Sequence, residues 1–313
     1  MTGGTLLAIV SLAVLIAAIW WPIRQERKRD LIGKEARTGA PGDFARLSQG
    51  VTYYRWFGPT RGPVIVAIHG LTTPSAIFED VAEGLGGLGY RVLVYDLYGR
   101  GLSDAPAGAH DRDFFVRQLT DLLGELELDE ELTLLGYSMG GSIATAFAQT
   151  NPHMISRLML VAPAGIILNE DSFDRFCRQT PILGDWVFGA LAPFVYRRRI
   201  VADTDLENSP DLKRIMLSQF ERRGYLPAVL ASRRGVLAED QKTAHQDLDR
   251  EGVPVLALWG ERDAVIPISA LGRFTQWNRS AQQDMIPDAG HGVLISHGKE
   301  VIASLTALLT KTP

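Results

Sequence analysis

The sequence predicts an α/β fold in which helices cover a mostly parallel sheet. Short, continuous apolar runs alternate along the chain with stretches that have the spacing of helices. A strand that is covered on both faces is apolar throughout, because none of its residues faces water. We expect such strands at residues 64–68, 91–96, 132–136, 157–162 and 253–260.

The composition is typical of a globular protein and argues against several classes of partner. The chain has 313 residues, 46% of them hydrophobic and 22% charged, with a net charge of -4. It is long enough to bury a substantial core. A mildly acidic chain lacks the cationic surface that nucleic acid requires. The single cysteine, Cys177, has no partner for a disulfide or a zinc site, so we expect a buried thiol, no metal and no cofactor.

Residues 1–23 have the pattern of a membrane anchor. No charged residue occurs from Thr5 to Trp21, and with the two preceding glycines this run makes about 19 residues, close to the length that a helix needs to cross ~30 Å of hydrocarbon. Trp20 and Trp21 stand where the helix would meet the headgroups. A basic cluster follows at Arg24, Arg27, Lys28 and Arg29.

The alternative for this segment is a cleaved secretory signal. Signal peptides carry their basic residues ahead of the apolar run and end on small residues, whereas here the basic residues follow a run that ends in Trp-Trp-Pro. We therefore expect an uncleaved, single-pass anchor. Because Lys and Arg near a helix end resist translocation, the positive flank favours a cytoplasmic location for the rest of the chain.

Residues 24–43 are charged and then rich in Gly and Pro, as a juxtamembrane linker would be, and the main domain is expected at 44–313. It begins with two runs rich in β-branched and aromatic residues, which Gln49 and Gly50 separate as in a hairpin. Removal of residues 1–30 is expected to leave a water-soluble, active protein.

The alternation of strands and helices is interrupted at about 164–251, where we expect a mainly helical insertion. Its aromatic residues have two possible roles: they line an apolar binding cavity, or they pack the insertion's own core. They are Phe173, Phe176, Trp186, Phe188, Phe194 and Tyr196. A basic run at 197–199 is either a solvated surface or a contact to anionic lipid headgroups.

The motif Gly136-Tyr137-Ser138-Met139-Gly140 stands between an expected strand and an expected helix. A serine on such a sharp turn has a strained backbone, and the residues two before and two after it must be small to avoid collision. The following helix N-terminus offers free N–H groups to developing negative charge. The sequence therefore predicts that Ser138 is a nucleophile.

A serine nucleophile requires a base, and the base requires an orienting acid. His291 lies in a loop with a glycine on each side, after a strand-like run, and is the expected base. Asp263 follows the strand at 253–260, at the edge of the sheet where catalytic groups gather, and is the expected acid. Glu261 is the competing carboxylate, but it lies closer to the strand and is expected to be structural.

Together these motifs resemble the α/β-hydrolase superfamily from Phe44 to the C-terminus. The resemblance rests on His69-Gly70-Leu71-Thr72, on the run from Asp96 to Asp104, and on the motifs around Ser138, Asp263 and His291. It implies a triad in the chain order Ser, Asp, His, and oxyanion-hole N–H groups from Leu71 and Met139. It also implies structural roles for His69 and Arg100.

Within the superfamily, the insertion and the segment Arg223-Gly224-Tyr225-Leu226-Pro227-Ala228 are similar to those of monoacylglycerol lipases, lysophospholipases and carboxylesterases. This resemblance implies hydrolysis of a small ester with an apolar acyl group. Two alternatives remain: a carbon-carbon bond hydrolase of aromatic ring-cleavage products, and a catalytically silent ligand-binding receptor. Fold-level similarity does not fix the substrate.

Overall fold

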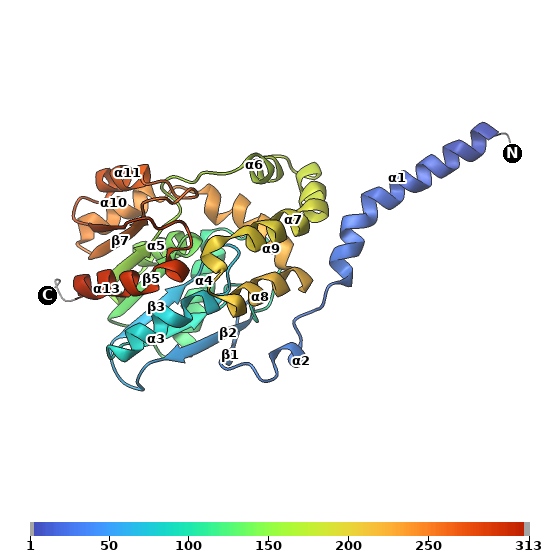
Figure 1. Cartoon of the computed structure of the whole chain (residues 1–313). Coiled ribbons are helices and arrows are strands. Elements are labelled where there is room, and N and C mark those ends of the chain that lie inside the picture. Colours follow the sequence, from blue (N-terminus) through green and yellow to red (C-terminus); the bar gives the residue numbers. More distant parts are fainter. Residues whose placement is uncertain (1–2, 310–313) are drawn as a thin grey trace.

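Eight strands form one sheet in the order β1-β2-β4-β3-β5-β6-β7-β8 (Figure 1). The computed structural model describes residues 3–309. The strands are β1 (Asp43–Leu47), β2 (Gly50–Phe57), β3 (Val64–Ile68), β4 (Arg91–Tyr95), β5 (Leu132–Tyr137), β6 (Ile155–Val161), β7 (Val255–Gly260) and β8 (Gln282–Ile286).

The sheet is parallel from β4 to β8, and the predicted fold class is confirmed. The hairpin partners β1 and β2 are antiparallel, and β2 also pairs antiparallel with β4. All five apolar runs form strands, with ends that differ by at most two residues from those expected. Because consecutive side chains point to opposite faces, Ile65 and Ala67 pack into one half of the core and Val66 and Ile68 into the other.

Two layers of helices bury these faces. One face packs against α3 (Glu79–Gly87), α12 (Val293–Ser296) and α13 (Gly298–Leu309). The other packs against α4 (Arg112–Glu125), α5 (Met139–Thr150), α10 (Lys242–Glu251) and α11 (Ser269–Trp277). The carboxyl ends of the parallel strands therefore meet at one edge, where the segments that follow them can form a site.

The insertion between β6 and β7 contains α6 (Ser172–Gln179), α7 (Leu183–Ala202), α8 (Pro210–Ser218) and α9 (Tyr225–Arg234). We refer to α6–α9 and their connections as the lid. The lid has its own apolar core, which includes Cys177, Phe188 and Phe220. Although α10 lies within the range expected for the insertion, it packs against α5 and α11 in the layer that covers the sheet.

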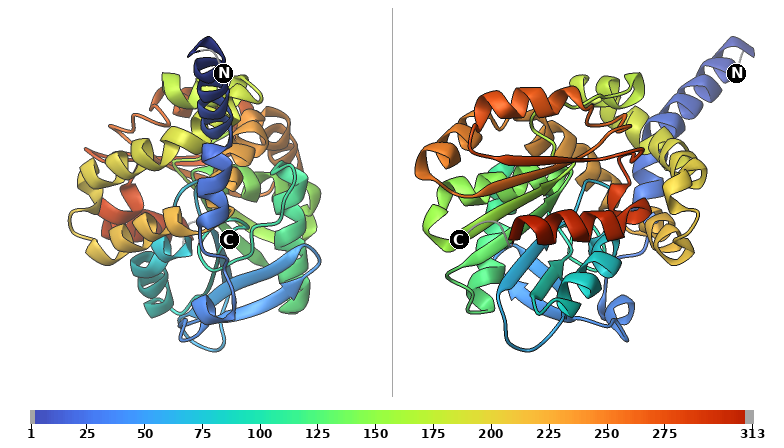
Figure 2. Two further views of the ribbon diagram at one scale, coloured as in Figure 1. Left: turned by 90° about the vertical axis from the view of Figure 1, so that its right-hand side faces the viewer. Right: turned by 60° about the vertical axis from the view of Figure 1, so that its left-hand side comes forward.

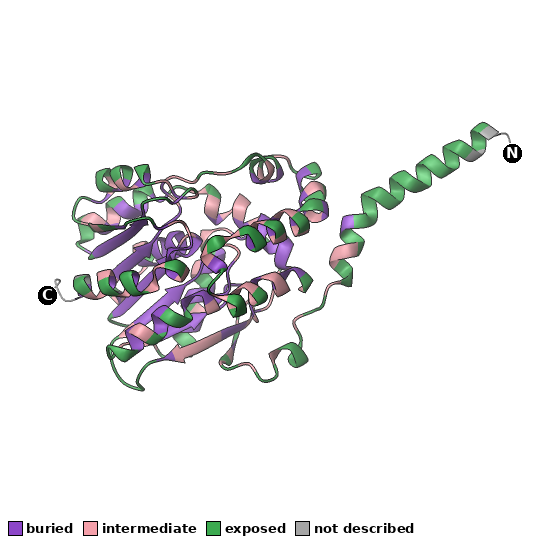
Figure 3. Ribbon diagram, in the orientation of Figure 1, coloured by how far each residue is buried: buried purple, intermediate pink, exposed green. Residues whose placement is uncertain are grey.

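Helix α1 (Gly3–Lys28) projects from the lid end of the molecule (Figures 1 and 3). It continues five residues beyond the expected end of the anchor at residue 23. Its segment Leu7–Lys28 is long and apolar enough to cross a membrane, and only 6% of its apolar window is buried. A short helix, α2 (Lys34–Arg37), lies in the expected linker.

Burial gives the fold a measurable sensitivity to acid. His245 of α10 is fully buried against Phe274 and Trp277 of α11. Burial lowers the pKa of its imidazole from 6.5 to about 3, because the charged ring would lose its hydration. The unfolded chain accepts a proton below pH 6.5 that the folded chain does not, so this group lowers the free energy of unfolding as the pH falls from 6.5 toward 3.

His245→Leu is therefore expected to make the fold less sensitive to acid. Between pH 7 and pH 5, the free energy of unfolding should fall by about 2 kcal/mol less in the variant than in the wild type, since each pH unit below the unfolded pKa is worth about 1.4 kcal/mol. Urea unfolding at both pH values measures the difference. The exposed His153 provides the control variant His153→Leu. An equal loss in His245→Leu and wild type would contradict the prediction.

Candidate active site

Ser138 occupies a strained turn between β5 and α5. Its backbone has φ 53° and ψ −118°, a conformation that non-glycine residues rarely adopt. A Cβ on Gly140 would overlap the carbonyl oxygen of Ile68, and a Cβ on Gly136 would lie 2.6 Å from the carbonyl oxygen of Gly140. The turn therefore requires glycine at both positions, and it presents the Ser138 hydroxyl at the carboxyl end of β5.

His291 and Asp263 lie beside Ser138 in a chain of hydrogen bonds. Nε2 of His291 is 3.0 Å from Oγ of Ser138, and Nδ1 is 2.8 Å from Oδ2 of Asp263. An ionised carboxylate only accepts hydrogen bonds, so Nδ1 carries the proton and Nε2 is free to accept one from the serine. The other oxygen of Asp263 accepts from the backbone N–H groups of Val265 and Ile266, each at 2.8 Å.

The competing carboxylate, Glu261, has a different contact. Its Oε2 accepts a hydrogen bond from the backbone N–H of Asp288 at 2.9 Å. This bond joins the turn after β7 to the loop that carries His291. The structure thus brings together the three residues that the sequence predicts for a triad, with Glu261 supporting the loop.

Two further contacts hold the His291 loop in place. The hydroxyl of Tyr137 donates to the His291 carbonyl oxygen at 2.8 Å. The N–H of Gly292 donates to Oδ2 of Asp205 at 3.1 Å, and Asp205 lies in a short 3-10 helix of the lid, η3 (Thr204–Leu206). Neither contact is predictable from the sequence, because Tyr137 and Asp205 lie in no recognisable motif and their partners are 154 and 87 positions away.

The residues expected to form the oxyanion hole approach Ser138 from two elements. Met139 is the first residue of α5, where backbone N–H groups have no partner within the helix. Leu71 follows Gly70, at which an added Cβ would lie only 3.4 Å from Cβ of Ser138. Both backbone segments therefore pass close to the serine hydroxyl.

Buried polar side chains fix the loop that carries Leu71. His69 is fully buried, and its Nε2 accepts from the N–H of Leu97 at 2.8 Å, with a pKa lowered by burial to about 3. Arg100 is also buried and donates to the Leu71 carbonyl oxygen at 2.9 Å and to the Ser232 hydroxyl of α9 at 2.8 Å. It therefore ties this loop to the base of the lid.

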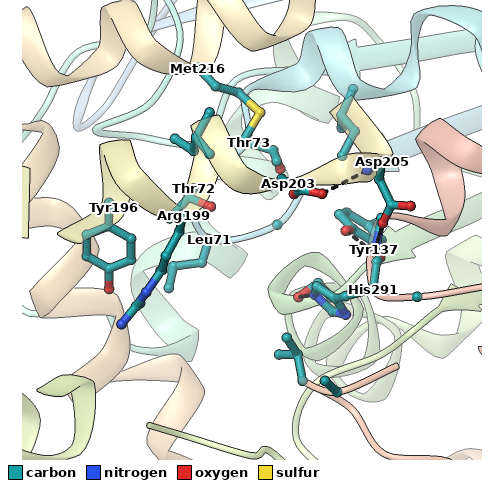
Figure 4. Close-up of a pocket in the computed structure, with 18 of the residues that line it drawn as sticks. Leu71, Thr72, Thr73, Tyr137, Tyr196, Arg199, Asp203, Asp205, Met216 and His291 are labelled. Carbon is teal, nitrogen blue, oxygen red and sulfur yellow. Dashed lines mark hydrogen bonds between the residues drawn. The ribbon is translucent and has the colours of Figure 1, made fainter. Parts of the chain in front are cut away.

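A cavity of about 510 Å³ lies between Ser138, His291 and the lid. Figure 4 shows that Tyr196 and Arg199 of α7 stand on one side of it and that His291, Tyr137 and Asp205 stand on the other. Apolar lining is supplied by Leu71, Ile77, Leu168, Ile200, Leu206, Met216, Leu237, Val265 and Ile295. The volume is typical of a site for a small organic ligand.

One wall of this cavity is an ionic network centred on Asp174 of α6. Asp174 accepts from the Tyr196 hydroxyl at 2.7 Å, from Arg199 at 2.8 Å and from Arg233 at 2.9 Å. Arg233 also donates to the Tyr196 hydroxyl at 3.0 Å and lies 3.4 Å from Glu170. The cavity is therefore polar on this side, so its lining is not entirely apolar.

The aromatic residues of the insertion divide into three groups. Tyr196 lines the cavity and is also buried in the lid core. Phe173 and Phe188 belong to the lid core, which was the alternative role for the whole set. Phe176, Trp186 and Phe194 are exposed on the outer surface of the lid, which neither interpretation predicted.

Among residues 3–309, no group of three or more His, Cys, Asp and Glu side chains is arranged to hold a metal ion.

Comparisons with known proteins agree with this architecture. A family model described as the alpha/beta hydrolase fold matches residues 63–298. The chain is 26% identical over 258 residues to a pimeloyl-[acyl-carrier protein] methyl ester esterase of Aliivibrio salmonicida, covering 81% of this chain and 95% of that protein. It is 27% identical over 217 residues to a 2-hydroxy-6-oxo-2,4-heptadienoate hydrolase of Pseudomonas putida, covering 68% and 75%.

Among solved structures, that of a membrane phospholipase A superposes with a TM-score of 0.69 at 19% identity and covers 99% of each chain. At this identity the likeness concerns the fold. It extends over nearly the whole length of the present chain, whereas the family model begins only at residue 63.

Gly140→Ala is expected to destabilise the protein by about 3 kcal/mol and to reduce activity, because the added methyl group forces the turn at Ser138 away from β3. Urea unfolding and hydrolysis of a soluble ester measure both effects. Gly124→Ala, within α4, is the matched control because nothing lies within 4 Å of its added Cβ. Unchanged stability in Gly140→Ala would show that the turn has more room than the structure indicates.

Proposed function

The chain belongs to the α/β-hydrolase fold family, and from that premise we propose that it is a membrane-anchored serine esterase that uses Ser138, His291 and Asp263. The observation that carries this proposal is the chain of hydrogen bonds from Asp263 through His291 to Ser138 at the wall of the cavity. The esterase relative of Aliivibrio salmonicida supports ester hydrolysis as the reaction class.

In the proposed mechanism, Oγ of Ser138 attacks the ester carbonyl carbon while Nε2 of His291 removes its proton. Negative charge develops on the former carbonyl oxygen, which the N–H groups of Leu71 and Met139 stabilise, each by about 3 kcal/mol. Asp263 holds the imidazole in the correct tautomer and stabilises the imidazolium. The intermediate collapses, the carbon-oxygen bond to the alcohol breaks, and the alcohol leaves with the proton from His291.

Water completes the cycle. His291 removes a proton from a water molecule, whose oxygen attacks the carbonyl carbon of the acyl-serine. Collapse of the second tetrahedral intermediate breaks the bond to Ser138, which recovers its proton from His291. The products are one alcohol and one carboxylic acid, and the enzyme returns to its starting state.

We propose a small, lipid-like ester such as a monoacylglycerol as the substrate. The apolar residues of the cavity suit an acyl chain, while Arg199, Tyr196 and the adjacent carboxylates suit a hydroxylated head group. Such a substrate partitions into lipid, which fits a catalytic domain held at the membrane by α1, with the domain on the cytoplasmic side because of the basic flank.

The two alternatives predict different reactivity. A carbon-carbon bond hydrolase is favoured by the relative of Pseudomonas putida, and it would act on a ring-cleavage product in preference to simple esters. A silent receptor of the same fold would turn over neither. Hydrolysis of a series of simple esters distinguishes the esterase from each of these alternatives.

The ester series from p-nitrophenyl acetate to palmitate is expected to show turnover with an optimum in chain length. Ser138→Ala should lower kcat by roughly 10⁴-fold or more, because only binding and the oxyanion-hole N–H groups remain, and circular dichroism should show that the variant is folded. Hydrolysis that persists in Ser138→Ala would identify a different nucleophile. Silence across the series would refute the esterase proposal.

The structure also changes the expected result of N-terminal truncation. Glu26 accepts a hydrogen bond at 2.6 Å from the N–H of Gly224, which precedes α9. Asp30 bonds through its backbone to Glu221 and Arg223, at 2.9 Å in each case. Removal of residues 1–30 therefore deletes contacts to the lid as well as the apolar helix.

A protein that starts at Pro22 is expected to be water-soluble and to retain the activity of the full chain. Removal of residues 1–30 should lower the free energy of unfolding by a further ~2 kcal/mol, since a hydrogen bond to a charged group contributes about 1.5–3 kcal/mol. Urea unfolding of the two truncated proteins measures the difference. Equal stability would mean that these contacts contribute nothing. A Pro22 protein that stays in the membrane fraction after an alkaline carbonate wash, which removes peripheral contacts, would mean that α1 is not the anchor.

A further inference from the structure

The outer surface of the lid carries large apolar side chains that are exposed to solvent. Ile182 is 85% exposed, Phe194 66%, Val201 59% and Leu183 54%. Soluble monomers rarely display a continuous surface of this kind without a partner. We refer to this set as the lid apolar face, and its members are Ile182, Leu183, Trp186, Leu191, Phe194 and Val201.

The spacing of these residues places them together on α7. Leu183, Leu191, Phe194 and Val201 are separated by 8, 3 and 7 residues, which are close to whole numbers of helical turns. Ile182 precedes the first turn of α7 and extends the surface at that end. The lid apolar face therefore follows one side of α7, on which the exposed Arg198 lies between Phe194 and Val201 and whose helix contains Pro193.

Helix α1 packs against α7 next to this stripe. Nε1 of Trp186 donates to the carbonyl oxygen of Ala18 at 3.0 Å. Pro22 is buried, and an added Cβ on Gly189 would lie 3.1 Å from its ring. Figure 2 shows the lower part of α1 lying against the lid while its N-terminal part extends away from the body.

These contacts fix the position of α7 along the axis of α1. Ala18 and Pro22 bracket Trp20 and Trp21, the pair expected at the level of the lipid headgroups. A helix that touches α1 on both sides of this pair lies at the same level. The N-terminal half of α7, with Ile182, Leu183 and Trp186, therefore lies at the level at which α1 would leave a bilayer.

We propose that the lid apolar face inserts into the interfacial region of the bilayer that α1 spans, as a second membrane contact. This inference rests on the proposed membrane anchoring. The partner surface is a phospholipid bilayer with anionic headgroups, because exposed basic side chains lie beside the apolar residues on α1 and among them on α7. They are Arg24, Arg27, Lys28 and Arg198.

The opposite side of α7 faces the cavity. Tyr196, Arg199 and Ile200 line it, so this one helix separates the cavity from the bilayer. A helix with its side chains is only about 10–12 Å across. The lid apolar face thus places the cavity within reach of an ester that resides in the headgroup region.

Quenching by lipids distinguishes a bilayer contact from a solvated surface. Single cysteines are introduced into the full-length chain in a Cys177→Ala background and labelled with an environment-sensitive fluorophore. Phe194→Cys and Ile182→Cys report on the lid apolar face, and Val10→Cys reports on α1. Leu88→Cys is the matched control, because Leu88 is 52% exposed and lies ahead of β4, at the strand ends opposite Ser138.

The labelled proteins are reconstituted into vesicles of phosphatidylcholine and phosphatidylglycerol that contain brominated lipids. We expect quenching at Phe194→Cys, Ile182→Cys and Val10→Cys to be several-fold stronger than at Leu88→Cys. Quenching at Val10→Cys without quenching at the two lid positions would overturn the lid contact while leaving the anchor intact. Absence of quenching at Val10→Cys would refute the anchor itself and this inference with it.

An activity readout tests the same contact without a label. The double variant Ile182→Glu/Phe194→Glu is expected to hydrolyse esters embedded in vesicles at least about tenfold more slowly, with turnover of water-soluble p-nitrophenyl acetate unchanged. Leu88→Glu should alter neither rate. Equal vesicle activity in the double variant and the wild type would overturn the proposal, as would burial of both lid labels against a second copy of the chain in place of lipid.

Discussion

The backbone of Ser138 is the constraint on which the rest of the site depends. A serine with φ 53° stores strain of about 1–3 kcal/mol, and surrounding packing must hold it there. Here β5 lies between β3 and β6 in the middle of the sheet, and all six of its residues are buried. The carbonyl oxygen of Ile68 leaves no room for a side chain at residue 140. The rigid centre of the sheet therefore sets the position of the hydroxyl, and the loops of His291 and Asp263 are arranged around it.

The sequence was sufficient to predict the five central strands, because strands covered on both faces are apolar runs that can be recognised without tertiary information, whereas the order of the strands in the sheet was not predicted. Ser138, Asp263 and His291 were recognisable because each lies in a turn that glycines or strand ends mark. The roles of the lid aromatics were not predictable. Whether Phe194 or Tyr196 faces a cavity depends on how α7 is rotated against its neighbours, and its apolar residues occur on more than one side. The sequence also did not predict where α1 ends. The helix continues through the charged residues after Trp21, because this part of α1 contacts the lid.

Helix α7 of the lid has three sides with different surroundings. The core side of α7 carries Phe188, the cavity side carries Arg199, and the outer side carries Phe194. The network around Asp174 joins α6, α7 and α9 through charged hydrogen bonds. Buried ion pairs contribute little net stability compared with apolar packing, but they are satisfied in only one arrangement. In this lid they join α6, α7 and α9 along one wall of the cavity.

The hydrogen bond from Gly292 to Asp205 joins the lid directly to the loop of the proposed base. Because Asp205 moves with η3 and Gly292 is the neighbour of His291, the lid cannot shift as a rigid unit without breaking this bond. The imidazole loses one of its supports whenever the lid is displaced. Any displacement of the lid would therefore also loosen the loop that carries the proposed proton acceptor, so the lid and the base are mechanically coupled.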